Sequence, residues 1–315
     1  MTETVAQGPL VIIGGRLEPD NGKLIREIAR LSGGKIAVLP TASSQPEAAA
    51  RDTVEVFARF GIEAESVPVH LEGAETSAQN ARHCARIEAL GSVYFTGGDQ
   101  SFILKALIQD DQETPVLRAI RAAHERGGLI AGSSAGAAMM SEPMILGGTS
   151  IEALIHGKSS APGKPGVPLG KGLGFFPHGL VDQHFLKRGR LGRLLVAMHA
   201  AGHDRGFGID ENTGMVVEGS SLRVVGERGM ILLELSGEGG ADEAGFRGVT
   251  VSYLDDGDRL DLKARSAEAG PTKTAIPTRD DAPRAPVRRW RNVFGSYVFT
   301  ELMERLMEAS PTGYA

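Results

Sequence analysis

The sequence predicts an α/β protein built on a doubly wound, mostly parallel sheet, with an antiparallel β section toward the C-terminus. Apolar strand-like runs alternate with amphipathic helical segments, which is typical of a parallel sheet covered on both faces. Glycine-rich corners at residues 14–15, 97–98 and 132–136 each follow such a run. Because parallel strands end at one edge, these corners should gather where open α/β sheets place their sites.

The N-terminal elements follow from this alternation. An apolar run over residues 9–15 closes on two glycines, and helical periodicity over 24–31 stops at Gly33 and Gly34. The same pattern predicts further strands over 35–40, 65–69, 92–95 and 129–131. It predicts further helices over 46–60, 78–90, 101–108 and 115–126.

The pattern changes after about residue 215. Short runs separated by turns predict antiparallel strands over 215–218, 222–225, 230–233 and 249–254. Residues 264–286 are polar and contain prolines, which predicts a mobile linker. An amphipathic helix is expected over 298–307, and its stripe of Phe299, Leu302, Leu306 and Met307 needs an apolar partner.

Composition narrows the class of protein. The 315 residues are 41% hydrophobic, enough for a substantial core, and the net charge of −5 argues against a dedicated nucleic-acid-binding protein. The single cysteine excludes an intrachain disulfide and a cysteine-based metal cluster. The first residues lack a signal-peptide layout, and no apolar run approaches the length of a membrane span. We therefore expect a soluble cytoplasmic protein.

The segment G-S-S-A-G-A over residues 132–137 contains a G-x-S-x-G corner between an apolar strand and an apolar helix start. Such a corner presents a serine hydroxyl at the tip of a sharp turn, where flanking side chains would clash. Ser134 is therefore a candidate nucleophile. The alternative is a strand–helix turn made of small residues, without chemistry.

A serine nucleophile needs a base and a group that orients this base. His184 lies near the end of an expected strand and is the preferred base; His178, close upstream, is the rival. The polar corner after residues 206–209 offers two carboxylates, Asp210 and Glu211, and either could orient the imidazole. The alternative for each of these residues is a purely structural role.

Two further features fit a hydrolytic site. The N–H groups of Ala135 and of the Gly98 corner could stabilise an oxyanion. The cations Lys187, Arg188, Arg190 and Arg193 follow directly on His184 in an otherwise acidic chain. They form either a solvated helix face or a clamp for substrate carboxylates, which the planar guanidinium group matches.

Three blocks carry a resemblance: G-S-S-A-G-A over 132–137, D-Q-H-F with R-x-R-L-G-R over 182–193, and G-I-D-E-N over 208–212. Together with T-G-G-D-Q at 96–100, they resemble the cyanophycinase family of serine exopeptidases, which also contains aspartyl dipeptidase. The order Ser, His, Glu differs from that of α/β-hydrolases, where the acid precedes the histidine. The resemblance predicts a peptidase domain over 8–262, followed by a linker and a C-terminal helix over 263–315.

The resemblance implies the remaining assignments. The sheet would be flavodoxin-like, related to class I glutamine amidotransferases, and the enzyme would be a homodimer without metal or cofactor. Ser134 would be the nucleophile, His184 the base and Glu211 the orienting acid. The substrate would be cyanophycin, a poly-aspartate that carries arginine on its side-chain carboxyls, and the products β-Asp-Arg dipeptides. The substrate pocket would comprise Gln100, Asp182, Gln183, Arg188, Arg190 and Arg193.

Two alternative functions remain at this stage. One is an aspartyl or isoaspartyl dipeptidase that acts on short peptides; the full arginine block favours the polymer. The other is a catalytically idle module that binds a polyanion, which the presence of Ser134, His184 and Glu211 argues against.

Overall fold

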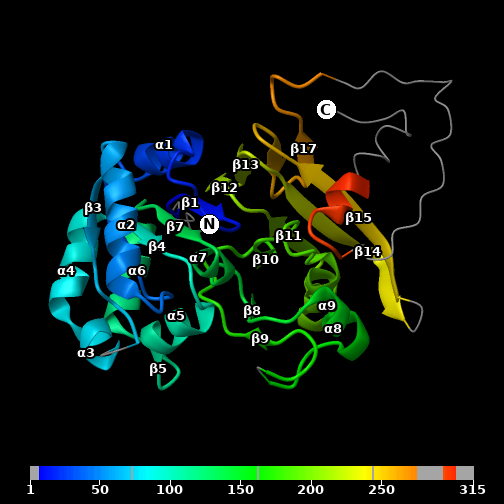
Figure 1. Ribbon diagram of the computed structural model, residues 1–315, viewed down its shortest axis with the longest axis horizontal. Coiled ribbons are helices and arrows are strands. Elements are labelled where there is room, and N and C mark those ends of the chain that lie inside the picture. The colour runs from blue at the N-terminus through cyan, green and yellow to red at the C-terminus, as the bar shows by residue number, and fades with distance from the viewer. Residues whose placement is uncertain (1–6, 72–73, 162, 243–244, 275–293, 303–315) are drawn as a thin grey trace, which may run out of the picture.

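Two sheets organise the computed structural model, which describes residues 7–71, 74–161, 163–242, 245–274 and 294–302 (Figure 1). The larger is a nine-stranded sheet. Its strands, in order across the sheet, are β17 (Ser266–Glu268), β16 (Arg259–Asp261), β13 (Ser221–Gly226), β12 (Thr213–Glu218), β1 (Leu10–Ile13), β7 (Ile130–Ser133), β4 (Val93–Phe95), β2 (Lys35–Leu39) and β3 (Glu63–Ser66). Strands β1, β7, β4, β2 and β3 are parallel, and the others continue the sheet in antiparallel pairs.

Helices cover both faces of the parallel strands, which confirms the predicted fold class. On β1, Val11 and Ile13 point to one face, and Leu10 and Ile12 point to the other. The first face packs against α1 (Gly22–Leu31) and α2 (Pro46–Arg59). The second packs against α4 (Ala81–Leu90), α5 (Gln100–Leu107), α6 (Pro115–Glu125) and α7 (Ala135–Ala138).

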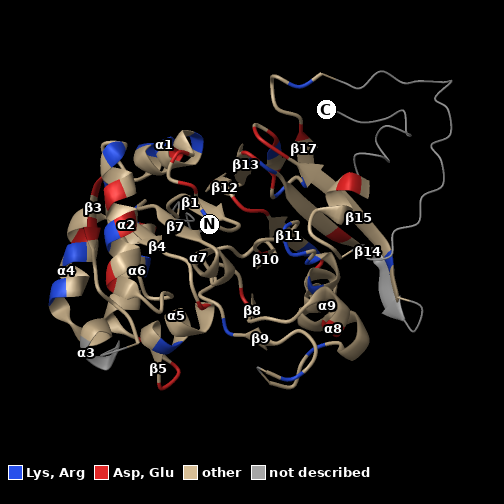
Figure 2. Ribbon diagram, in the orientation of Figure 1, with Lys and Arg blue, Asp and Glu red and all other residues tan. Residues whose placement is uncertain are grey.

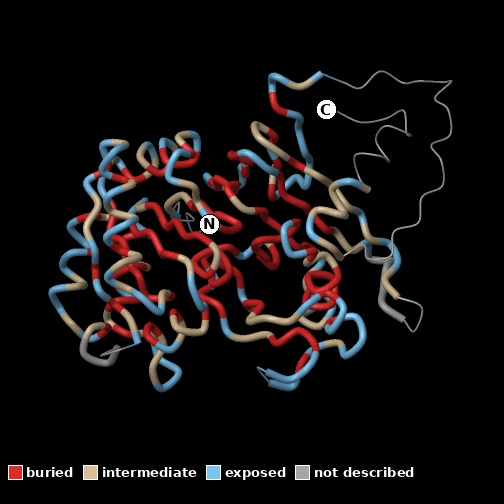
Figure 3. The backbone as a smooth tube through the Cα atoms, viewed as in Figure 1, coloured by how far each residue is buried: buried red, intermediate tan, exposed pale blue. Residues whose placement is uncertain are grey.

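The smaller main sheet has the order β10 (Leu180–Asp182), β11 (Arg205–Ile209), β14 (Met230–Asp242) and β15 (Gly245–Leu254). Phe207 and Leu232 join the core under the larger sheet, whereas Ile231 and Leu233 face α8 (Ser150–His156) and α9 (Leu191–Ala201). The backbone tube of Figure 3 is red, meaning buried, along the central strands of both sheets. Two small antiparallel pairs complete the described strands: β5 (Ile108–Gln109) with β6 (Gln112–Glu113), and β8 (Met144–Ile145) with β9 (Leu169–Gly170).

Several boundaries differ from the sequence predictions. The strand expected at 65–69 is β3 at Glu63–Ser66, and the helix expected at 78–90 is divided into α3 (Ala74–Gln79) and α4. Asn80 causes this break, because its side chain accepts a hydrogen bond from the Arg82 N–H and so begins a new helix. The C-terminal antiparallel strands also divide between the sheets: β12 and β13 extend the larger sheet, and β14 and β15 join the smaller.

The predicted C-terminal elements are only partly within the described residues. The linker expected at 264–286 contains β17, which pairs with β16, and its residues 275–286 lie outside the described chain. The helix expected at 298–307 is helical over 298–302, and the rest lies outside the described residues. The domain boundary at residue 262 stays a prediction. Among the described helices, none combines the length and apolar character that a bilayer span requires.

Candidate active site

The carboxyl ends of three adjacent parallel strands bring the predicted glycine corners together. Strand β7 lies between β1 and β4, and these strands end at Ser133, Ile13 and Phe95. The corners at 14–15, 97–98 and 132–136 therefore meet at one edge of the larger sheet, as the sequence predicts.

Ser134 occupies a strained turn between β7 and α7. Its backbone has φ 52° and ψ −104°, a combination that non-glycine residues rarely adopt and that is common at functional sites. Its N–H donates to the Ile13 carbonyl at 3.0 Å. A Cβ atom added at Gly136 would lie 2.5 Å from the Phe95 carbonyl oxygen, so glycine is required for this close approach. The turn thus holds the Ser134 hydroxyl at the sheet edge.

His184 follows the end of β10 and faces Ser134. Its N–H donates to the Gly14 carbonyl, and its Nε2 lies 2.8 Å from the Ser134 Oγ. A Cβ added at Gly15 would lie 2.7 Å from the His184 Nδ1 and 2.7 Å from the Glu211 Cγ. The second glycine of the first corner therefore leaves room for the imidazole and the neighbouring carboxylate.

The two carboxylates after β11 point to different partners. The Glu211 Oε1 lies 2.7 Å from the His184 Nδ1. Asp210 is fully buried, and its Oδ1 accepts the Lys187 N–H at 3.1 Å. Glu211 thus contacts the imidazole ring of His184, whereas Asp210 contacts the backbone of the loop that carries His184.

Asn212 holds the corner that carries both carboxylates. It adopts φ 55°, a left-handed conformation that asparagine tolerates. The Asn21 Nδ2 donates to the Asn212 Oδ1 at 2.7 Å, and the Asn212 N–H donates to the Arg16 carbonyl at 2.9 Å. These bonds tie the Glu211 corner to the start of α1.

The predicted oxyanion donors lie beside Ser134. A Cβ added at Gly97 would be 3.4 Å from the Ser134 Cβ, which places the 97–98 corner against the hydroxyl-bearing turn. Gly98 has φ 147°, and a side chain there would overlap the Ala42 carbonyl. Ala135 is the first residue of α7, so its N–H has no acceptor within the helix.

The arginine cluster has two parts with different surroundings. Arg193 is buried and donates from Nε to the Asp182 Oδ2 at 2.8 Å, from Nη2 to Oδ1, and from Nη1 to the Gly148 carbonyl at 2.8 Å. The Arg190 Nη1 lies 3.7 Å from the Asp182 Oδ1 and donates to the Gln183 carbonyl at 2.5 Å. Arg188 is exposed. Figure 2 shows blue segments, which mark Lys and Arg, between β11 and α9.

Two glutamines complete the predicted pocket. The Gln100 Nε2 donates to the Ile145 carbonyl at 2.8 Å, which ties the start of α5 to β8. The Oε1 of Gln183 is buried and, among the described residues, lacks a hydrogen-bond partner. Burying an acceptor without a partner is costly.

The electrostatic environment favours the neutral form of His184. Burial lowers the pKa of His184 below its ordinary value of 6.5; the hydrogen bond to Glu211 opposes this, and the positive charges of Arg188 and Arg190 add to it. The rival His178 precedes β10 and packs edge-on against the Phe176 ring. The structure brings His184, not His178, to Ser134.

Two contacts that shape this region were not foreseen from the sequence. The glycine corner at 14–15 was expected at the site, but not that Gly15 leaves room for His184 and Glu211. The Ser150 Oγ donates to the Gly189 carbonyl at 2.6 Å and accepts the Arg193 N–H at 3.2 Å, joining the starts of α8 and α9. The T-S-I-E capping box at 149–152 marks this helix start in the sequence.

Comparisons with known proteins identify the family to which the chain is similar. The sequence profile of Peptidase family S51 matches residues 10–225. The cyanophycinase of Synechococcus elongatus is 34% identical over 234 residues, which cover 72% of this chain and 68% of the relative. The cyanophycinase of Geminocystis herdmanii is 29% identical over 278 residues, covering 83% and 96%.

One solved structure extends the comparison to the fold. A peptidase from an acI-B1 Actinobacterium superposes with a TM-score of 0.61 at 21% identity, over 81% of this chain and 97% of that one. Ser134, His184 and Glu211 lie within the profile match, whereas the segment 294–302 lies beyond it.

Proposed function

This chain belongs to peptidase family S51, as its resemblance predicted, and we propose that it is a serine exopeptidase that hydrolyses cyanophycin. The proposal rests chiefly on one observation: Ser134, His184 and Glu211 form a continuous hydrogen-bonded chain at the sheet edge, with a buried positive cluster beside it. The first part supports the reaction and the second supports an acidic substrate.

In the proposed mechanism, the His184 Nε2 takes the Ser134 hydroxyl proton as the oxygen attacks the scissile carbonyl. Glu211 holds the other ring nitrogen and stabilises the imidazolium that forms. The N–H groups of Ala135 and Gly98 would donate hydrogen bonds to the carbonyl oxygen and so stabilise the negative charge that develops on it. His184 then gives its proton to the leaving amine, and the acyl group stays on Ser134. Water, activated by the same imidazole, releases the acid.

This mechanism requires neutral His184. The pH below which the rate falls should therefore depend on the charges around the imidazole. Removing the nearby cation in Arg188→Ala stabilises imidazolium and raises the pKa of His184. The rate of Ser134 labelling by a fluorophosphonate should therefore decline at a higher pH than in the wild type. Arg188→Lys keeps the charge and should keep the wild-type midpoint. Identical midpoints for Arg188→Ala and the wild type would contradict this electrostatic role.

An excess of buried positive charge supports an acidic substrate. The Asp182 carboxylate faces the guanidinium groups of both Arg193 and Arg190, which leaves one positive charge in excess. Burial, opposed in part by Asp182, lowers the pKa of Arg190 to about 9, so this group stays a cation at neutral pH. We propose that Arg190 and Arg188 bind substrate carboxylates, and that Arg193 and Asp182 position them.

This division of roles can be tested with two matched variants. Arg190→Ala should cost about 2–5 kcal/mol of transition-state stabilisation on cyanophycin and far less on a small ester without carboxylates. Arg193→Ala removes both guanidinium hydrogen bonds to the buried Asp182 and leaves only the more distant Arg190, so it should lower the free energy of unfolding by about 3–5 kcal/mol. Arg193→Ala should also lower the rates of hydrolysis of cyanophycin and of the small ester equally. A selective loss on cyanophycin in Arg193→Ala alone would reverse the two roles.

The decisive experiment on function is incubation with purified cyanophycin, followed by mass analysis of the soluble products. We expect β-Asp-Arg dipeptides, released from chain ends. Activity on short aspartyl or isoaspartyl peptides without polymer cleavage would establish a dipeptidase instead. Reaction with neither substrate would overturn the proposed specificity. The homodimer that the resemblance implies and the cytoplasmic location expected from the sequence are further proposals, which sedimentation and cell fractionation would test.

A further inference from the structure

The segment 294–302 lies against the loop 184–190 that carries His184 (Figure 1). The Tyr297 N–H donates to the Leu186 carbonyl at 3.0 Å. A Cβ added at Gly189 would overlap the Phe294 carbonyl, so the two backbones are in close contact there. Phe299 packs on the apolar cluster that contains Phe185 and Leu186. This segment therefore covers the outer side of the histidine loop.

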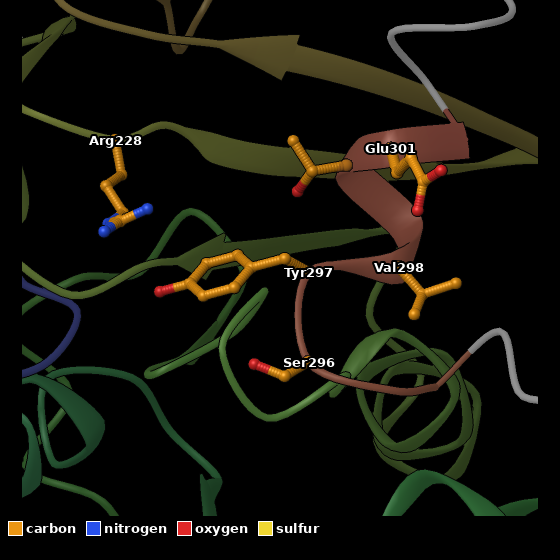
Figure 4. Close-up of a pocket in the computed structure, with 6 residues that line it drawn as sticks. Arg228, Ser296, Tyr297, Val298 and Glu301 are labelled. Atoms are coloured by element: carbon orange, nitrogen blue, oxygen red, sulfur yellow. The ribbon is translucent and has the colours of Figure 1, made fainter.

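Tyr297 connects this segment to two neighbouring loops. Its ring centroid lies 5.4 Å from the Lys187 Nζ and 4.9 Å from the Arg228 Cζ, both within the range of cation–π attraction. Figure 4 shows the ring extending from the segment toward Arg228. Because Lys187 belongs to the histidine loop and Arg228 to the turn between β13 and β14, the ring joins these two loops.

The turn that carries Arg228 is bonded to the corner that carries the acidic residues, because the Asp210 N–H donates to the Gly229 carbonyl at 3.3 Å. Burial raises the pKa of Tyr297, and the negative charges of Asp210 and Glu211 add to this, so the hydroxyl stays protonated at neutral pH. Asp210 is also the residue that accepts the Lys187 N–H. Tyr297 therefore lies where the histidine loop and the Glu211 corner meet.

The backbone conformation suggests that these contacts hold Tyr297 in place. Its φ of 57° lies in the left-handed region, which is unusual for a bulky aromatic residue. Such a conformation persists where surrounding contacts fix it, and it clusters at functional sites. Here the fixing contacts are the bond to Leu186 and the two cations.

We propose that Tyr297 is a positioning residue for the peptidase reaction. It holds the His184 loop against the corner that carries Glu211, and so maintains the geometry that activates Ser134. The inference rests on the proposed function, because it assigns His184 and Glu211 their catalytic roles. It adds to that function a requirement for a C-terminal segment outside the matched family region.

The test compares Tyr297→Ala with Tyr297→Phe and with the control Ser296→Ala, which changes an exposed neighbour. A small displacement of a catalytic group can cost on the order of 100-fold in rate. We therefore expect Tyr297→Ala to lose roughly 10- to 100-fold both in kcat and in the rate of Ser134 labelling by a fluorophosphonate, with KM little changed. Tyr297→Phe keeps the ring and should retain most of both rates, as should Ser296→Ala.

Three outcomes would overturn the proposal: wild-type labelling in Tyr297→Ala, an equal loss in Tyr297→Phe, or an equal loss in Ser296→Ala. If Tyr297→Ala does not fold, the double variant Lys187→Met with Arg228→Met replaces it, since it removes both cations. Unchanged labelling in this double variant would equally exclude the role. Failure of the wild type to label at all would refute the proposed function itself, so the two failures are distinguishable.

Discussion

Replacing Ser134 with alanine is expected to abolish hydrolysis, with a fall in kcat on the order of a million-fold. The hydroxyl lies 2.8 Å from the His184 Nε2 and is the group that the proposed mechanism makes into a nucleophile. Alanine keeps a Cβ in the same strained turn, and the turn is held by backbone contacts such as the bond to Ile13. The free energy of unfolding should therefore change little.

The preceding residue supplies the matched control for this variant. Ser133 is a buried serine at the end of β7, one position from Ser134 but outside the hydrogen-bonded chain to Glu211. Ser133→Ala should retain both hydrolysis and fluorophosphonate labelling, whereas Ser134→Ala should lose both. Turnover at the wild-type rate in purified Ser134→Ala would refute the serine mechanism, and full loss in Ser133→Ala would transfer the role to the neighbour.

The parallel half of the fold could be predicted because its signals are local. Apart from the polar edge strand β3, each parallel strand is a short apolar run that ends at a glycine or polar corner, and the helices have their own period and end signals. The C-terminal strands were also visible as runs, but their partners were not. Strand β14 pairs with β11, and β12 pairs with β1, which lies some two hundred residues earlier in the chain. Such long-range pairing depends on how the helices pack, and a local pattern does not contain it.

The candidate site shows the same limit at the level of side chains. The patterns around Ser134 and His184 could be recognised locally, since the turn that presents each residue lies within a few positions of it. The arginine cluster could not be divided in this way. Arg193 turns inward because α9 packs beside β10, which supplies Asp182, and this contact joins residues eleven positions apart in different elements. Spacing alone therefore could not separate the buried Arg193 from the exposed Arg188.

The adjacent carboxylates of Asp210 and Glu211 could not be distinguished from the residues either, because both lie in one polar corner. Consecutive side chains in an extended corner point in different directions. In the structure, Glu211 points to the His184 Nδ1 at 2.7 Å, whereas Asp210 points to the Lys187 N–H. This difference in direction makes the two residues a matched pair for mutation.

Glu211→Gln is therefore expected to lower kcat on the order of 10,000-fold with little change in KM. The amide can keep the ring in place, but it can hold the wrong tautomer and carries no charge to stabilise imidazolium. Asp210→Asn keeps an oxygen that can accept the Lys187 N–H, and burial already raises the pKa of Asp210, so losing its charge should cost far less. The measurements are kcat and KM on cyanophycin and the labelling rate of Ser134 in both variants. A larger loss in Asp210→Asn than in Glu211→Gln would contradict this assignment. The hydrogen bond between Glu211 and His184 would then not be required for the reaction, and the orienting role would pass to Asp210.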